Sequence, residues 1–258
     1  MKTALQKGQI LDSDRPPRGS IVDATVALQL PDTVWTHGAL PGILEAIPVN
    51  CESLVDLGCG RGIIGALCRI YRAPRRLVGV DGFEPYLAFC KQMGFYDETF
   101  RSDLRETPLP FRAQEFHVAT CIEVIEHLPK GAGKTLLDEL ERIASCVIVA
   151  TPGIWFEQDN YDGNILQRHL SLWRTSEFRD RGYQVWGVGA LSIGYQIRSV
   201  MSKVVGKHAV SVAQSEIRGA ARRVSEALGP LTRSWPQLST KLLCVKTAEF
   251  ASRRDGDS

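Results

Sequence analysis

Short apolar runs alternate with segments of helical spacing from residue 53 to the end of the chain. The runs that predict strands are SLVDL at 53, LVGV at 77, ETFR at 98, HVATCI at 117, CVIVA at 146, YQVWGV at 183 and TKLLCV at 240. Segments such as IIGALCRIY and KTLLDELERIA repeat apolar residues at the three- and four-residue spacing of an amphipathic helix. This alternation predicts an α/β fold in which helices cover both faces of a mainly parallel sheet.

The 258 residues suffice for one large core with an appendage. Residues 1–34 are predicted to form an N-terminal arm, because the first twenty are polar and contain prolines. Residues 35–258 are predicted to form one domain, with a short helix at PGILEAIP.

A basic segment lies between the last two predicted strands. Residues 194–241 contain eight lysines and arginines but only two glutamates, and their apolar residues recur at helical spacing. We therefore predict a basic helical insertion at residues 194–239. Such a segment can lie on an anionic membrane as a peripheral contact or meet an anionic substrate. It can also pack its apolar side on the core or on a second subunit of a homodimer, or cap a substrate site.

Composition and charge are ordinary, with 44% hydrophobic residues and a formal net charge of +2, which excludes a protein whose whole surface binds nucleic acid. The seven cysteines are scattered and never form a C-x-x-C pair, which disfavours disulfides and zinc. No signal peptide or membrane span is apparent, so we expect a soluble, cytoplasmic protein.

The glycines of VDLGCGRG, at residues 55–62, follow the first predicted strand with the spacing G-x-G-x-G. The dinucleotide fingerprint G-x-G-x-x-G requires its third glycine at Ile63, so NAD is disfavoured. Asp56 next to the turn suits an ammonium group better than a pyrophosphate. Asp81, at the end of the second strand, can accept hydrogen bonds from both ribose hydroxyls of an adenosine. These features favour S-adenosylmethionine as the cofactor.

Four motifs, in order, resemble those of the class I S-adenosylmethionine-dependent methyltransferases: VDLGCGRG, VGVDGFEPYL, SDLRETPLPF and FHVATCIEVIEHL. The resemblance covers residues 35–190 and the strand TKLLCVK. It implies a Rossmann-like, doubly wound sheet of seven strands in the order 3-2-1-4-5-7-6. One departure is His117, where the family often has aspartate.

The resemblance also implies the residues that hold the cofactor. The glycine turn would pass under the methionine moiety, Asp81 would hold the ribose, Asp103 and Leu104 would meet the adenine, and Ile122 and Glu123 would line the cofactor. With the residues of the turn, the predicted cofactor-binding residues are Asp56, Gly58, Cys59, Gly60, Gly62, Asp81, Gly82, Asp103, Leu104, Ile122 and Glu123.

Candidates for catalysis follow the fourth strand and lie in the connection after the fifth. If the turn CIEVIEHL is helical, Glu123 and His127 share one face with Glu126 alongside. The methyl group of the cofactor is already activated, so a base is needed mainly when the nucleophile is a hydroxyl. The catalytic candidates are therefore His127, His169 and Glu123.

The long connection TPGIWFEQDNYDGNILQRHLSLW mixes aromatic and amide side chains, which is typical of a wall that binds a polar ring such as a sugar or a phenol. We expect Trp155, Tyr161 and Trp173 to contribute to this wall, together with Gln158, Asn160, Asn164 and Gln167.

The residues leave three functional hypotheses. The favoured one is methyl transfer to a hydroxyl of a small sugar-containing or natural-product-type molecule. The set Glu123, Glu126, His127 and His169 also resembles the divalent metal site of the small-RNA 3′-terminal 2′-O-methyltransferases. The E-x-x-E-H run is widespread among methyltransferases without a metal, and no separate RNA-binding domain is apparent, so nucleic acid and metal are disfavoured. A non-catalytic scaffold that binds the cofactor is the third hypothesis.

Overall fold

The computed structural model describes residues 39–160, 163–192 and 229–248. The chain divides into two units, Met1–Asp32 and Thr33–Ser258, and every described residue belongs to the second. The predicted arm and residues 194–228 of the predicted insertion lie outside the described residues, so their structure and their domain boundaries stay predictions.

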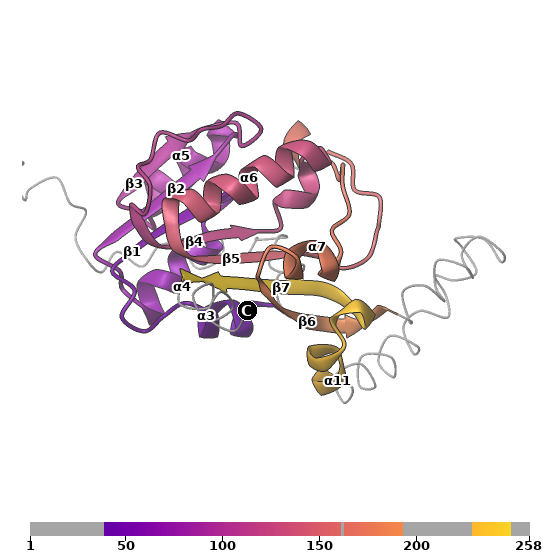
Figure 1. Cartoon of the computed structure of the whole chain (residues 1–258). Helices are drawn as coiled ribbons and strands as arrows, with labels where there is room; N and C mark the ends of the chain where they lie inside the picture. The colour runs from indigo at the N-terminus through magenta and orange to yellow at the C-terminus, as the bar shows by residue number, and fades with distance from the viewer. Residues whose placement is uncertain (1–38, 161–162, 193–228, 249–258) are drawn as a thin grey trace, which may run out of the picture. The chain divides into compact units, whose positions relative to one another are not determined.

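The described residues form one seven-stranded sheet in the order β3-β2-β1-β4-β5-β7-β6, as predicted (Figure 1). The strands are β1 (Ser53–Leu57), β2 (Arg76–Asp81), β3 (Glu98–Arg101), β4 (Phe116–Ile122), β5 (Ala144–Pro152), β6 (Gln184–Leu191) and β7 (Ser239–Thr247). β1 to β5 are parallel, whereas β7 runs antiparallel to β5 and β6. β7 therefore begins at the edge of the sheet where the parallel strands end.

In the described ranges the helices are α3 (Leu40–Ala46), α4 (Ile63–Tyr71), α5 (Glu84–Met93), α6 (Lys130–Ile143), α7 (Thr175–Arg179) and α11 (Gly229–Ser234). Three single turns of 3-10 helix are η2 (Ile125–His127), η3 (Ile165–Gln167) and η4 (Pro236–Leu238). Among the described helices, none is long and apolar enough to cross a membrane. The cytoplasmic location stays a prediction.

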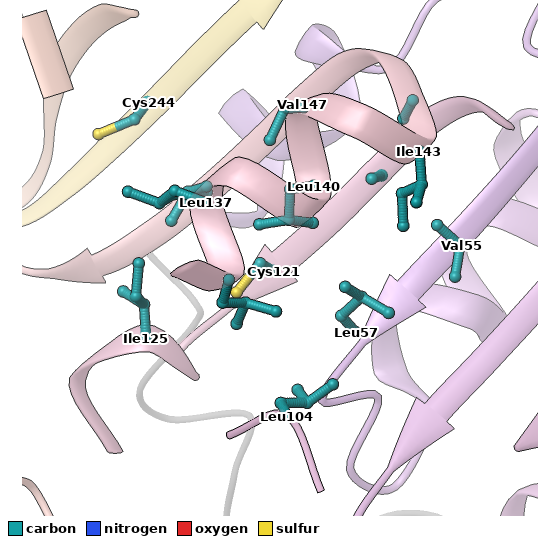
Figure 2. Close-up of a cluster of buried hydrophobic side chains, with 14 of the residues drawn as sticks. Val55, Leu57, Leu104, Cys121, Ile125, Leu137, Leu140, Ile143, Val147 and Cys244 are labelled. Atoms are coloured by element: carbon teal, nitrogen blue, oxygen red, sulfur yellow. The ribbon is translucent and has the colours of Figure 1, made fainter. Parts of the chain in front are cut away.

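Two hydrophobic clusters, one on each face of the sheet, form the core. Helix α6 buries Leu136, Leu137, Leu140 and Ile143 at helical spacing in one of them. Figure 2 shows side chains of α6 together with Val55 and Leu57 of β1 and Cys121 of β4. The other cluster joins apolar residues of α3, α4 and α5 to the opposite side of the same strands. Because both faces are covered, the strands read as nearly continuous apolar runs in the sequence.

All seven cysteines are buried and free. Five of them, Cys51, Cys59, Cys68, Cys90 and Cys146, lie in the cluster formed by α3, α4 and α5 with the sheet. They therefore contribute to the core as small apolar side chains.

Candidate functional site

A cavity of about 110 Å³ lies where β1, β2, β3 and β4 end. Its walls come from the segments directly after these strands and from the connection after β5. The lining residues are Gly58, Gly60, Asp81, Gly82, Asp103, Leu104, Arg105, Glu123, Val124, His127, Leu128, Asn164, Ile165, Leu166, Gln167, Arg168 and Leu170. The cavity thus brings together seven of the predicted cofactor-binding residues and one further catalytic candidate, His127.

The glycine turn after β1 has a backbone that other residues rarely adopt. Gly58, Gly60 and Gly62 have φ values of 74°, 52° and 82°, which is the left-handed region that glycine enters without steric cost. A Cβ atom on Gly58 would lie 2.2 Å from Cγ2 of Val124, so the turn packs directly on the segment after β4. A Cβ atom on Gly60 would meet no atom within 4 Å. Gly60 therefore leaves open space at the cavity.

Asp81 is the last residue of β2, and its side chain stabilises the glycine turn through a hydrogen bond. Its Oδ2 atom accepts a 2.9 Å hydrogen bond from the N–H of Gly60, and its Oδ1 atom accepts a 2.8 Å bond from the N–H of Phe83. Burial raises the pKa of Asp81, and these hydrogen bonds oppose the rise. Each carboxylate oxygen keeps a second lone pair, so the side chain can still accept hydrogen bonds from a ligand in the cavity.

Asp56 has a different environment from the one predicted. It does not line the cavity; its buried carboxylate accepts a 2.6 Å hydrogen bond from the Tyr96 hydroxyl and a 2.7 Å bond from Thr120 Oγ1. The N–H of Gly65 in α4 in turn donates to the Tyr96 oxygen over 3.2 Å. Burial raises the pKa of Asp56 to about 6. Asp56 thus connects β1 to β4 directly through Thr120 and to α4 through Tyr96. Its contact with an ammonium group stays a prediction.

Cys59, Gly62 and Ile122 also lie outside the cavity lining. Cys59 is buried in the cluster with α3, α4 and α5, where Ile122 is also found. Gly62 is the residue before α4. The structure therefore assigns these three residues to the framework of the turn and of β4, and any contact with the cofactor stays a prediction.

Asp103 and Leu104 follow β3 and line the cavity as predicted, but the sequence analysis did not single out their neighbour Arg105. Nε of Arg105 donates to Oδ1 of Asp103 over 2.8 Å, and the hydrogen bonds with Arg105 lower the pKa of Asp103. At neutral pH Asp103 is therefore ionised. The position of Arg105 two residues after Asp103 is a local signal that could have revealed this pair.

Glu123, directly after β4, has a φ of 55°. This left-handed conformation costs a residue with a side chain on the order of 1 kcal/mol, and such strain is concentrated at functional sites. The Oε2 atom of Glu123 lies 2.7 Å from Nζ of Lys241 in β7. Burial raises the pKa of Glu123, and Lys241 opposes the rise. Lys241, which the sequence placed with the basic insertion, is therefore a buried partner of the site.

The segment after β4 is not the helical face that the sequence suggested. Helix η2 begins only at Ile125, so Glu123 precedes it, whereas Glu126 lies within it and brings a carboxylate oxygen within 4.8 Å of a ring nitrogen of His127. Glu126 is buried, and its Oε2 atom accepts a 3.0 Å hydrogen bond from Thr151 of β5. Burial, together with the nearby charge of Glu123, raises the pKa of Glu126 well above its usual range.

His127 and His169 lie side by side, with ring centroids 4.9 Å apart. His127 Nδ1 is 3.2 Å from the carbonyl oxygen of Arg168, and His169 Nδ1 is 3.0 Å from that of Phe156. A carbonyl oxygen only accepts, so both Nδ1 atoms carry the proton, and Nε2 is the acceptor nitrogen of each neutral ring. Burial and the neighbouring His169 lower the pKa of His127 to about 4, so its ring is neutral at pH 7.

These two histidines and Glu126 offer three ligand atoms that lie within 4.8 Å of one another. Nitrogen and oxygen donors of this kind suit a divalent metal ion. The structure thus brings together three of the four residues of the predicted metal set, whereas the fourth, Glu123, is paired with Lys241. His169 does not line the cavity.

The connection after β5 forms one wall of the cavity, here called the 164–170 wall. The backbone N–H groups of Leu170 and Ser171 donate to the carbonyl oxygen of Glu126 over 2.8 and 3.0 Å, which holds the wall against η2. At its other end, a Cβ atom on Gly82 would lie 2.7 Å from Cδ1 of Leu166. The wall therefore spans from β4 to β2 across the cavity.

Only some of the residues predicted for this wall line the cavity. Asn164 and Gln167 line the cavity, whereas Trp173 does not: it is 1% exposed and donates from Nε1 to the carbonyl oxygen of Ile125 over 3.2 Å. The prediction for Trp173 was wrong, because its ring fills the core against α6. Trp155 is 49% exposed and lies beside His169, with centroids 6.3 Å apart. Gln158 donates to the backbone of Gln167, and Tyr161 lies outside the described residues.

Known proteins share both the sequence motifs and the fold. Residues 55–145 match the family model described as a methyltransferase domain. The ubiquinone biosynthesis O-methyltransferase of Hahella chejuensis is 30% identical over 129 residues, which cover 47% of this chain and 44% of the relative. The protein of the same name from Haemophilus ducreyi is 30% identical over 113 residues, covering 41% and 44%. The chain thus spans less than half the length of these curated relatives.

Two solved structures share the fold at low sequence identity. A chain of the complex between the Haloferax volcanii Trm112 methyltransferase activator and a methyltransferase superposes with a TM-score of 0.56 at 16% identity, covering 84% of this chain and 91% of that one. A SAM-dependent methyltransferase from Archaeoglobus fulgidus gives a TM-score of 0.50 at 13% identity, covering 83% and 93%.

Residues 55–145 are thus similar to a methyltransferase domain, and the described residues have the fold of solved methyltransferases, which supports the class I S-adenosylmethionine-dependent methyltransferases as the class of this domain. S-adenosylmethionine, the cofactor predicted from the glycine turn, is the cofactor of this class. Within the class, the curated sequences that match are ubiquinone biosynthesis O-methyltransferases.

Proposed function

We propose that this protein transfers the methyl group of S-adenosylmethionine to a hydroxyl of a small polar molecule. The observation that carries the proposal is the neutral imidazole of His127 in the same cavity as Gly58, Asp81 and Glu123. The cavity thus combines features that suit the cofactor with a group that can take up a proton. The names of the relatives, which are O-methyltransferases, support oxygen as the methylated atom.

The charges of the cavity fit S-adenosylmethionine better than a dinucleotide. Asp81, Asp103 and Glu123 bring three carboxylates to the lining, one more than the two guanidinium groups of Arg105 and Arg168. The carboxylates would repel a pyrophosphate, whereas the cofactor carries an ammonium and a sulfonium and no phosphate. Gly60 leaves space for a ligand to approach the turn, and Asp81 keeps lone pairs for ribose hydroxyls.

In this reaction the protein mainly positions the acceptor. When it is bound, S-adenosylmethionine supplies an activated methyl group. Alignment of an acceptor oxygen with that group can contribute about 7–11 kcal/mol toward lowering the barrier. His127, whose Nδ1 proton is held by the carbonyl oxygen of Arg168, presents Nε2 as the atom that accepts the hydroxyl proton.

The 164–170 wall supports a small acceptor with both polar and apolar parts. Asn164, Gln167 and Arg168 offer polar atoms, while Ile165, Leu166 and Leu170 offer apolar surface. Such a mixture suits a hydroxylated ring, and a sugar-containing or natural-product-type acceptor is our specific proposal.

A panel of hydroxylated acceptors tests the proposal. Purified protein with S-adenosylmethionine should convert at least one sugar-containing or phenolic compound to its methyl ether, detected as a mass gain of one methylene unit. No methyl transfer to any member would refute it. Cofactor binding without turnover on a broad panel would favour the scaffold hypothesis.

A metal-assisted RNA 2′-O-methyltransferase is the second candidate, which the cluster of Glu126, His127 and His169 favours. In that case these three residues would hold a divalent ion, which would polarise the acceptor hydroxyl. Burial lowers the pKa of His169, and the positive charge of Lys241 adds to the decrease; the same charge acts against a cation here. This candidate predicts that a chelator or His169→Ala abolishes activity and that manganese restores the chelated enzyme. Activity unchanged by both treatments would remove it.

A further inference from the structure

Lys241 belongs to the antiparallel strand β7 and reaches the site through its ion pair with Glu123. It stands third in β7, opposite Pro152, the last residue of β5. Because β7 starts where the parallel strands end, this position brings the lysine to the edge of the sheet that carries the cavity. Its side chain is 12% exposed, and that of Glu123 is 17% exposed.

The pair leaves polar atoms without hydrogen bonds. Within the described residues, Oε1 of Glu123 and Oε1 of Glu126 are buried and have no hydrogen-bond partner, and Nζ of Lys241 has none beyond its ion-pair contact with Oε2 of Glu123. Buried groups of this kind destabilise a fold unless something pairs with them. Only Glu123 among the three lines the cavity, so its carboxylate is the group of the three best placed to meet a ligand.

The backbone of Glu123 is fixed independently of the lysine. Its N–H group donates to the carbonyl oxygen of Ala150 over 2.8 Å, and its neighbour Val124 packs on Gly58 of the glycine turn. Glu123 therefore lies next to the turn that, by the family resemblance, passes under the methionine moiety. The backbone contacts do not fix the direction of the Glu123 side chain. A largely buried carboxylate turns toward water unless a cation lies beside it, so the direction of this side chain depends on Lys241.

We propose that Lys241 is a positioning residue that holds the Glu123 carboxylate toward the cavity, where this carboxylate receives the cationic methionine end of S-adenosylmethionine. The inference rests on the proposed function, because it takes S-adenosylmethionine as the ligand. Lys241 acts through Glu123 and does not touch the cofactor itself. The last strand of the sheet thus contributes to cofactor binding through one ion pair.

Calorimetry with S-adenosylmethionine and S-adenosylhomocysteine tests this role. Lys241→Met should weaken S-adenosylmethionine binding about tenfold or more, because the carboxylate loses its fixed position. Lys241→Arg keeps the cation and should restore most of the affinity. The matched control is Lys246→Met in the same strand. Nζ of Lys246 lies 2.7 Å from Oε2 of Glu141, and neither residue lines the cavity. Loss of this ion pair should leave the affinity unchanged.

A double-mutant cycle distinguishes positioning from general destabilisation. Glu123→Gln should weaken binding, and adding Lys241→Met to it should weaken binding no further, because both changes remove one interaction. Additive losses, or a Lys241→Met protein that binds like the wild type, would overturn the inference.

Two controls keep this test decisive. If Lys241→Met does not fold, the variants Lys241→Arg and Glu123→Gln decide. Unchanged affinity in Glu123→Gln contradicts the inference. Affinity that is retained in Lys241→Arg and lost in Glu123→Gln supports it. A wild-type protein that binds neither sulfur ligand refutes the proposed function itself, which is a different outcome from equal binding by wild type and variants.

Discussion

The N–H group of Gly60 donates a 2.9 Å hydrogen bond to Oδ2 of Asp81. This bond joins the turn after β1 to the end of β2, so two features that the sequence predicts separately form one unit. The carbonyl oxygen of Val80 strengthens the connection, because it accepts bonds of 2.7 and 2.9 Å from the N–H groups of Gly58 and Cys59. The candidate cofactor site is therefore built from the contact between two neighbouring strand ends.

Replacing the Asp81 carboxylate should impair cofactor binding. In Asp81→Asn, the amide group has one acceptor oxygen for the N–H groups of Gly60 and Phe83, which now use two. The affinity for S-adenosylmethionine should fall about tenfold to a hundredfold, the loss expected for hydrogen bonds to a charged group. Calorimetry measures this change, with the exposed Asp180→Asn as control; equal affinities in both variants would contradict the role of Asp81.

Gly60 and Gly94 form a matched pair for testing the open space at the turn. Both have left-handed φ values, 52° and 65°, and a Cβ atom on either would meet no atom within 4 Å. Alanine at either site should therefore lower the free energy of unfolding by a similar amount, about 1–2 kcal/mol. Only Gly60→Ala should also weaken S-adenosylmethionine binding, by about tenfold or more, because its methyl group enters the ligand space. The same affinity in both variants would mean that the ligand does not pass over Gly60.

The Tyr96 hydroxyl should stabilise the fold in a pH-dependent way. Burial raises the pKa of Asp56 from 3.8 to about 6, so the folded state holds the proton more tightly than the unfolded chain. Ionised Asp56 therefore destabilises the fold increasingly as pH rises from about 4 to above about 6, and the bond from Tyr96 reduces this effect.

Tyr96→Phe removes that bond and should lower the free energy of unfolding by about 1–3 kcal/mol. Because the pKa of Asp56 then rises further, the loss should be larger above about pH 7 than at about pH 4. Urea unfolding at several pH values measures it, with the exposed Tyr71→Phe as control. A loss independent of pH would show that Tyr96 acts only through packing and through its hydrogen bond with the N–H group of Gly65.

His127 should matter for turnover and not for cofactor affinity. Its Nε2 atom is the proposed proton acceptor, so His127→Ala should lower kcat about a hundredfold or more with a hydroxyl acceptor. Binding of S-adenosylhomocysteine should stay close to that of the wild type. His117→Gln, at the opposite end of β4, is the control and should change neither value. A normal kcat in His127→Ala would leave alignment as the source of catalysis.

The sequence predicted the seven strands, their order and most of the cavity. Parallel strands covered on both faces leave continuous apolar runs, and residues directly after such strands meet at one edge of the sheet. Gly58, Gly60, Asp81, Asp103 and Glu123 could therefore be assigned to one site before their contacts were known.

Contacts between distant segments could not be predicted in this way. Nothing in the spacing pairs Lys241 with Glu123, since a lysine in a basic stretch usually faces solvent. The sequence also cannot tell that Asp56 faces two hydroxyl groups beneath the turn, or that Trp173 fills the core and not the wall. Each of these outcomes depends on which side chain the packed neighbours leave room for.

The central claim is that the cavity at the strand ends binds S-adenosylmethionine. Titration calorimetry of the wild-type protein with S-adenosylmethionine, S-adenosylhomocysteine and NAD tests it most directly. The account predicts saturable binding of both sulfur ligands and no binding of NAD. Binding of NAD in preference to both would contradict it.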